Sequence, residues 1–271
     1  MNATVHPTAI VDPRACLAAD VTVGPYAIIE GPVVVGEGTT IRARATLIGP
    51  MKIGRRCDIG INCTLGERPQ HLAYAGQETE VVIGDGNTFR EGVTVHRPMP
   101  GGQTIIGDRN FFMAYGHVAH DCIVKNDCIF ANNAMLAGHA IIDDRVFFSG
   151  GSAIHQHCRI GTLAMISGVS AVTKDVPPYW IMQNFNLVSG VNVVGMKRAG
   201  VPSLEIMAVR KAFKIMYLRQ LPISAAVEEI EAELGQYPAI RTLLAFIRES
   251  KRGICGASCY AGHHGEVAQA A

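Results

Sequence analysis

Histidines at a regular spacing are the residues of this sequence best suited to chemistry. His139 lies 18 residues after Asp121, and His157 lies 18 residues after His139. His117 and His120 stand just before Asp121. An imidazole exchanges its proton near neutral pH, and a carboxylate beside it can orient the ring or raise its basicity. His120 is therefore the best candidate for a general base, with Asp121 as its partner.

Further polar residues fall into the same spacing. Gly138 stands 18 residues after His120, and Gln156 stands 18 after Gly138, directly behind His155. A glycine leaves its backbone N–H unshielded, as a donor to an oxyanion requires. No serine or cysteine nucleophile has a convincing base beside it. The simpler mechanism is direct attack by an acceptor that His120 deprotonates.

A six-residue repeat predicts the element that positions these side chains. Bulky apolar residues recur at every sixth position from Ile106 to Val172, and mostly small residues stand four positions after each. The same repeat runs from Val5 to Leu65 and resumes at Ile83. Only a hexapeptide β-solenoid repeats this way, with three units closing one coil. Residues 18 apart then stack about 4.8 Å from each other, so the polar group converges on one side.

Breaks in the repeat indicate how the chain is organised. Residues 1–186 are predicted to form the solenoid, with loops projecting at 66–80 and 98–104 where the repeat stops. Both loops leave the same stretch of coils and would wall a cleft. A connector and a small α-helical domain are expected over 187–253. The Gly- and Ala-rich segment 254–271 is expected to be disordered, and its Cys and His spacing is not a standard zinc pattern.

Composition excludes several classes of function. The 271 residues carry a net charge of +1 and are only 17% charged, which argues against a nucleic-acid-binding surface. The first residues lack the basic start and apolar run of a signal peptide, and no apolar run approaches the ~20 residues of a transmembrane helix. We therefore expect a cytoplasmic protein. Five cysteines occupy the small, inward-facing position of the repeat, where they act as buried hydrophobes: Cys57, Cys63, Cys122, Cys128 and Cys158.

Several segments resemble one family of enzymes. HVAHDC (117–122), NNAMLAGH (132–139), AIHQ (153–156), DVPPYW (175–180) and GVNVVGMKRAG (190–200) are similar to the acyl-carrier-protein-dependent UDP-N-acetylglucosamine O-acyltransferases. The resemblance implies a mostly β fold, a left-handed parallel β-helix followed by a small C-terminal helical domain. It also implies a homotrimer with active sites between subunits, and neither a cofactor nor a metal. The implied reaction moves a 3-hydroxyacyl group from acyl carrier protein to the sugar 3-hydroxyl, the first step of lipid A synthesis.

The same resemblance implies roles for individual residues. The family's general base falls on His120, its polarising acid on Asp121 and its oxyanion-binding backbone on Gly138. Contacts to the nucleotide fall on Asn192 and Arg198. The remaining positions match substrate contacts or, for the last, the position that limits acyl length: His117, His139, His155, Gln156 and Gly168. A basic helical face suits an acidic carrier protein, with an ordinary solvated face as the alternative: Arg198, Arg210, Lys211, Lys214 and Arg219.

Four positions depart from the family pattern. His71 and Ala73 replace an acidic residue and a lysine in the first loop, while Val194 and Ala199 replace a nucleotide-contacting acid and a phosphate-contacting arginine. These changes leave open a different nucleotide sugar or an amine as acceptor. Three other classes are less consistent with the sequence. The helical domain argues against a coenzyme-A-dependent acetyltransferase, the intact histidine segments against a non-catalytic scaffold, and Asp121 against a zinc-dependent carbonic anhydrase.

Overall fold

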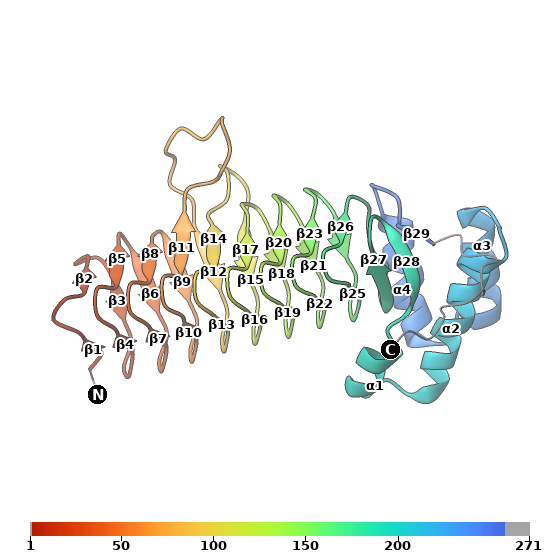
Figure 1. Ribbon diagram of the computed structural model, residues 1–271, viewed down its shortest axis with the longest axis horizontal. Helices are drawn as coiled ribbons and strands as arrows, with labels where there is room; N and C mark the ends of the chain where they lie inside the picture. The colour runs from red at the N-terminus through yellow and green to blue at the C-terminus, as the bar shows by residue number, and fades with distance from the viewer. Residues whose placement is uncertain (1, 258–271) are drawn as a thin grey trace, which may run out of the picture.

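The computed structural model describes residues 2–257, and most of them wind into coils of short strands that stack along one axis (Figure 1). The coils form three sheets whose neighbouring strands run parallel, as a hexapeptide repeat requires. A small group of helices packs at the C-terminal end (Figure 1). The predicted left-handed parallel β-helix with a helical domain is confirmed.

Each complete coil contributes one strand to each sheet, and sheet A continues beyond the coils with its last two strands. Sheet A comprises β1 (Thr4–Val5), β4 (Thr22–Val23), β7 (Thr40–Ile41), β10 (Asp58–Ile59), β13 (Thr88–Phe89), β16 (Phe111–Phe112), β19 (Ile129–Phe130), β22 (Phe147–Phe148), β25 (Met165–Ile166), β27 (Trp180–Gln183), β28 (Leu187–Val191) and β29 (Gly256–Ala257). Sheet B comprises β2 (Ile10–Val11), β5 (Ile28–Glu30), β8 (Thr46–Ile48), β11 (Thr64–Glu67), β14 (Thr94–His96), β17 (His117–Val118), β20 (Met135–Leu136), β23 (Ala153–Ile154) and β26 (Ala171–Val172). Sheet C comprises β3 (Cys16–Leu17), β6 (Val33–Val35), β9 (Met51–Ile53), β12 (Val81–Ile83), β15 (Thr104–Ile106), β18 (Ile123–Val124), β21 (Ile141–Ile142) and β24 (Arg159–Ile160).

The bulky residues of the repeat fill the interior of the helix. Phe89, Phe112, Phe130 and Phe148 form a continuous stack, with centroid separations of 5.0, 4.5 and 4.5 Å between successive rings. All four rings are fully buried. The five cysteines that the repeat assigns to its small position are also buried and carry free thiols. Stacked apolar side chains therefore fix the register of the coils, as the spacing predicts.

The corners of the coils impose a left-handed backbone conformation. Asp121, His139 and His157 all have φ of 61° and follow one another up the same corner. Asp, Asn and His are the non-glycine residues that adopt this conformation most readily. The backbone conformation of the corner therefore explains part of the preference for Asp and His at these positions.

Two loops leave the same corner, between sheets B and C. The first spans residues 68–80, between β11 and β12, and is the large projection in Figure 1; the second spans 97–103, between β14 and β15. The buried Arg97 side chain ties their bases together, since its Nε donates to Gly66 O (2.7 Å). Thr79 Oγ1 donates to Pro98 O (2.7 Å) across the two loops. The loops are thereby held against one another.

The C-terminal region contains α1 (Val193–Arg198), α2 (Ser203–Leu218), α3 (Ile223–Leu234) and α4 (Pro238–Glu249). The structure differs from the expected connector, because residues 187–191 form β28, which pairs with β27 in antiparallel fashion. Trp180 on β27 is fully buried and lies edge-on to Tyr217 of α2, with centroids 4.9 Å apart. This contact joins the helices to the last coil. Within the described residues, none of the helices has the length and apolar character needed to cross a membrane.

The predicted disordered segment is ordered over its first residues. Ile254 and Cys255 are buried, and Gly256–Ala257 forms β29 beside β28. Cys255 N–H donates to Asp175 O (2.8 Å), and Tyr217 Oη donates to Cys255 O (2.6 Å). Two buried side chains, two hydrogen bonds and the pairing of β29 with β28 thus hold a segment whose composition alone suggested disorder. The rest of that prediction, residues 258–271, lies outside the described residues.

Candidate functional site

His120 and Asp121 form a buried pair at the end of β17. Only 8% of His120 and 7% of Asp121 is exposed. His120 Nδ1 lies 2.6 Å from Asp121 Oδ2. An ionised carboxylate only accepts hydrogen bonds, so the imidazole proton lies on Nδ1 and the lone pair lies on Nε2. The pair therefore presents His120 Nε2 as a base.

The second loop holds the Asp121 side chain in place. From the loop, Met99 N–H donates to Asp121 Oδ2 (3.2 Å), while the Asp121 backbone N–H donates to Thr104 Oγ1 at the start of β15 (2.8 Å). The other carboxylate oxygen lies against Gly102, where a Cβ atom would stand 1.6 Å from Asp121 Oδ1. Met99 and Gly102, which belong to no recognisable sequence motif, thus position the Asp121 carboxylate.

Adding one methyl group at Gly102 tests this arrangement. The variant Gly102→Ala is expected to push the Asp121 carboxylate away from His120 and to lower kcat roughly 10- to 100-fold, less than the about 10²- to 10⁴-fold lost with a general base itself, because the base stays in place. Gly190→Ala is a matched control, since a Cβ there meets nothing within 4 Å. Steady-state transfer rates and melting temperatures would be compared. Equal activity of the two variants at equal stability would contradict a positioning role of the loop.

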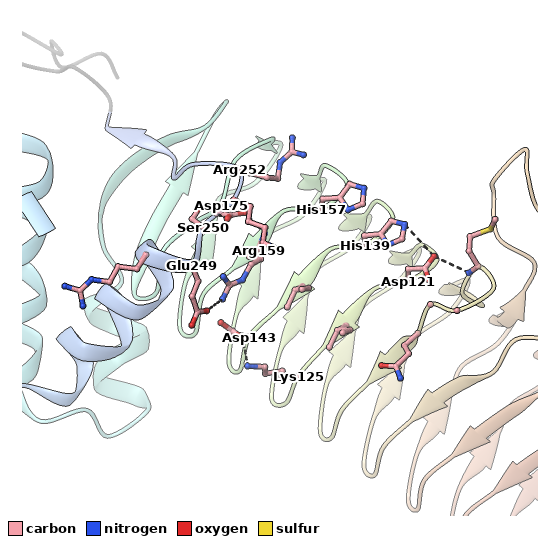
Figure 2. A pocket seen from close by; sticks show the side chains of 18 of the residues that line it. Asp121, Lys125, His139, Asp143, His157, Arg159, Asp175, Glu249, Ser250 and Arg252 are labelled. Atoms are coloured by element: carbon pink, nitrogen blue, oxygen red, sulfur yellow. Dashed lines mark hydrogen bonds and ion pairs between the residues drawn. The ribbon is translucent and has the colours of Figure 1, made fainter. Parts of the chain in front are cut away.

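Four imidazole rings form a continuous series around the pair. The His71 ring lies edge-on to His120 (5.5 Å between centroids), His120 lies edge-on to His139 (5.3 Å), and His139 stacks on His157 (4.5 Å). His139 Nε2 is 3.7 Å from Asp121 Oδ2, as Figure 2 shows. The predicted column of Asp121, His139 and His157 therefore exists. Burial lowers the pKa of His139, and the Asp121 charge opposes that effect.

Gly138 stands directly over the His120 ring. A Cβ atom on Gly138 would lie 2.7 Å from His120 Cε1 and 2.8 Å from Nε2, so only glycine fits here without moving the ring. Gly138 O accepts from His157 N–H (3.0 Å), whereas Gly138 N–H donates to no group of the described chain. A free backbone donor beside a base is the arrangement that an oxyanion site needs.

His96 is a buried neighbour that the sequence reasoning missed. Its ring lies edge-on to His117 (5.1 Å), and its Nδ1 finds no hydrogen-bond partner within residues 2–257. His117 Nδ1 is 2.7 Å from Thr94 Oγ1. His117 pairs in register with Thr94, so His96 lies two positions beyond that partner and no 18-residue spacing links it to the other histidines. A histidine at the end of β14, just before the second loop, was the available signal.

The half-buried His117 predicts a pH-dependent stability. Burial, with a smaller effect of His96, lowers the pKa of His117 to about 4 from the usual 6.5. The unfolded chain therefore binds a proton that the folded chain does not, and the free energy of unfolding falls as pH decreases from about 6.5 to about 4. His117 contributes roughly 2–3 kcal/mol to this loss.

Urea unfolding at pH 7.5 and pH 4.5 would measure this contribution. His117→Gln is expected to lose less stability than the parent chain between the two pH values, because glutamine does not titrate. Identical pH dependence of the two proteins would contradict a neutral, half-buried His117.

The other residues implied by the resemblance lie apart from His120 in the chain. His155 and Gln156 are exposed, and His155 Nδ1 contacts Gln156 O (3.2 Å). Gly168 lies exposed after β25 of sheet A. Asn192 is buried and caps α1, because its Oδ1 accepts from Gly195 N–H (2.9 Å) and its Nδ2 donates to Leu163 O (2.8 Å). Both polar atoms of the Asn192 amide therefore already form hydrogen bonds within the chain.

Two hollows lie on different faces of the β-helix. The larger, about 1320 Å³, runs from Asp121, His139 and His157 to the segment after α4, as Figure 2 shows. The smaller, about 690 Å³, lies beside α1 on sheet A. Its lining includes three apolar strand residues and four positions near the implied nucleotide contacts: Ile129, Phe147, Met165, Asn192, Val194, Arg198 and Ala199.

Ion pairs reduce the free positive charge of the helical face. Lys211 pairs with Glu233, and Arg219 pairs with Glu229. Arg210 and Lys214 are exposed on α2, and neither forms an ion pair within the described part of the chain. The basic face predicted for a carrier protein is therefore narrower than the sequence suggests.

Comparisons with known proteins agree with this geometry. Residues 175–255 match the family model described as UDP N-acetylglucosamine O-acyltransferase, domain 2. The chain is 45% identical over 255 residues to the acyl-(acyl-carrier-protein)–UDP-N-acetylglucosamine O-acyltransferase of Myxococcus xanthus, covering 93% of this chain and 99% of that protein. The UDP-N-acetylglucosamine acyltransferase structure from Bacteroides fragilis matches with a TM-score of 0.89 and 36% identity, covering 93% of this chain and 99% of that chain.

The corresponding structure from Moraxella catarrhalis matches equally well, with a TM-score of 0.89, 37% identity and coverage of 94% of this chain and 100% of that chain. The relatives are aligned over nearly their whole length, so the likeness includes both the β-helix and the C-terminal helices. The chain therefore belongs to the acyl-(acyl-carrier-protein)–UDP-N-acetylglucosamine O-acyltransferase family.

Proposed function

We propose that this protein transfers a 3-hydroxyacyl group from acyl carrier protein to the 3-hydroxyl of UDP-N-acetylglucosamine, the first step of lipid A synthesis. The observation that carries the proposal is the buried His120–Asp121 pair packed against Gly138, whose N–H is free within the described chain. This arrangement joins a base and an oxyanion donor at one point. Because the donor is a carrier protein of fatty acid synthesis, we expect the reaction in the cytoplasm.

His120 Nε2 starts the reaction by removing the proton of the sugar hydroxyl. The hydroxyl oxygen attacks the thioester carbonyl carbon, and Asp121 stabilises the imidazolium that forms through the 2.6 Å contact to Nδ1. The carbonyl oxygen becomes an oxyanion, which Gly138 N–H can receive. This charge exists only in the transition state and the intermediate, so the donor acts mainly on kcat.

The intermediate then collapses with loss of the carrier thiol. The new C–O bond stays, the C–S bond breaks, and the imidazolium of His120 returns its proton to the leaving sulfur. No side chain of the enzyme is acylated. The buried cysteines are unsuited to such a role, since burial raises the pKa of the Cys122 thiol to about 12.

A homotrimer would complete the site. Asn192, Arg198 and Gly168 lie on the sheet A side, whereas His120 lies at the corner between sheets B and C. The two hollows share no lining residue. We therefore expect the nucleotide end of the acceptor to bind the α1 side of a neighbouring copy, opposite His120.

The identity of the acceptor can be tested by a single competition experiment. Val194 and Ala199 line the smaller hollow and His71 lies beside His120, so three of the four departures from the family pattern would border the acceptor in the proposed trimer. A different nucleotide sugar or an amine is the alternative. 3-Hydroxyacyl carrier protein would be offered UDP-N-acetylglucosamine and its 3-amino analogue together, and the products identified by mass spectrometry.

The proposal predicts that the O-acylated sugar is the main product. Preferential formation of the amide would show that the natural acceptor is an amine, while the roles of His120, Asp121 and Gly138 in acyl transfer would stay the same. If the coenzyme A thioester gave product at the same rate as the acylated carrier protein, the enzyme would not require acyl carrier protein as its donor.

A further inference from the structure

His120, Asp121 and His139 bring three metal-ligating side chains together. Their ligand atoms all lie within 4.8 Å of one another. Within residues 2–257, no other three His, Cys, Asp or Glu side chains place their ligand atoms this close together. Asp121 Oδ2 is at the centre, 2.6 Å from His120 Nδ1 and 3.7 Å from His139 Nε2. Two imidazoles and one carboxylate are also the protein ligands of many open zinc sites.

The distances suit a small divalent ion after a minor movement. Zinc binds nitrogen and oxygen ligands at about 2.0–2.2 Å, so two ligands of a tetrahedral ion stand about 3.3–3.5 Å apart. The Asp121–His139 distance of 3.7 Å is already close to this value. The His120–Asp121 contact must widen by less than about 1 Å, with the ion taking the place of the hydrogen between the two atoms.

The group is accessible from solvent. His139 has 41% of its side chain exposed, and both His139 and Asp121 line the larger hollow of about 1320 Å³. That hollow leaves a fourth coordination position open to water. Imidazole ligands favour zinc and other late transition metals over Mg²⁺, which prefers oxygen ligands and retains its own waters.

We propose that His120, Asp121 and His139 bind one Zn²⁺ ion per chain and that the bound ion switches acyl transfer off. The inhibition rests on the proposed function; the binding does not. With Zn²⁺ on Nδ1, the neutral His120 ring carries its proton on Nε2, the atom that must be free to act as the base. Asp121 becomes a ligand of the ion and no longer orients the ring. Zinc would therefore inhibit transfer, and a chelator would restore it.

Metal binding can be measured without any assay of activity. The full-length protein, stripped with a chelator, would be titrated with Zn²⁺ and Mg²⁺ by calorimetry and with Co²⁺ by visible absorption. We expect one Zn²⁺ per chain, bound at least about tenfold more tightly than Mg²⁺. His139→Ala loses some stability because alanine is disfavoured at this left-handed corner, but at a partly exposed position it should remain folded and weaken Zn²⁺ binding at least about tenfold. Asp121→Asn is a second variant with the same expected effect.

Two controls make the assignment specific. His6→Ala removes an exposed histidine far along the chain and should not change binding. The triple variant Cys259→Ser, His263→Ala, His264→Ala removes the other concentrated thiol and imidazole groups of the sequence and should also bind normally. Unchanged binding in His139→Ala, or loss of binding in the triple variant alone, would overturn the proposal. If the protein binds zinc at this site but shows no transferase activity, the metal site stands and the proposed function is rejected.

Discussion

Replacement of His120 by alanine is expected to lower kcat/KM for acyl transfer about 10³-fold, within the range attributed to a positioned general base. The substitution removes the only base held against Asp121 and Gly138 in the described chain. It also removes the imidazole donor of the buried Asp121 carboxylate, which keeps only the Met99 N–H on the same oxygen. The effect should appear mainly in kcat, because proton removal contributes only to the transition state.

Stability must be separated from chemistry in this experiment. His120 lies at a corner and contributes no ring to the stacked interior, so the variant should remain folded and keep the oligomeric state of the parent chain. His6→Ala, a substitution at an exposed histidine of the first coil, serves as the matched control and should retain normal rates. Near-normal turnover by His120→Ala would reject the assignment of the base.

A single methyl group at Gly138 is expected to cost about as much as removal of an oxyanion donor, roughly 10²- to 10³-fold in kcat. A Cβ atom would stand 2.7–2.8 Å from two atoms of the His120 ring, so the ring must turn away from its present position. The same atom would crowd the N–H that receives the oxyanion. Both effects act on the same step, so kcat falls while the apparent KM changes little.

Gly150→Ala is the matched substitution. Gly150 stands at another corner, and a Cβ there meets only Asn132 O at 3.4 Å, an ordinary contact. We expect Gly150→Ala to keep most of the activity that Gly138→Ala loses. Rapid-quench rates and melting temperatures of both variants would test this. Equal losses in the two variants would indicate a general intolerance of the corners and contradict a specific role of Gly138.

The six-residue spacing predicted the fold well because a solenoid is periodic. Each bulky residue must enter the interior of its own coil, so spacing alone fixed the strand register and the stack of Phe89, Phe112, Phe130 and Phe148. The same periodicity predicted that Asp121, His139 and His157 follow one another, which their contacts confirm. Where the period ends, the prediction failed. Residues 187–191 turn back to pair in antiparallel fashion with β27, the strand just before them, and residues 256–257 add β29 beside β28 from much further along the chain.

The site was predictable only to the extent that the repeat places it. His71 lies on a loop with no periodic pattern, and its contact with His120 depends on how the loop folds back. His96 was missed because it lies two positions past Thr94, the register partner of His117, and so belongs to no column of histidines. The capping role of Asn192 could not be read from its type, because an asparagine amide serves a ligand and a helix N-terminus equally well. Charge on α2 was overestimated, since the pairing of Lys211 and Arg219 with acids of α3 requires the packed helices.

Direct transfer from the carrier thioester to the acceptor, with His120 as the base, is best tested by following the acyl group itself. The protein would be mixed with 3-hydroxyacyl carrier protein, with and without UDP-N-acetylglucosamine, and the masses of both proteins and of the sugar recorded over time. We predict that the carrier keeps its acyl group until the sugar is added, that the protein never gains the mass of the acyl group, and that the sugar then gains it. Transfer of the acyl group onto the protein, or its loss from the carrier without an acceptor, would contradict the mechanism.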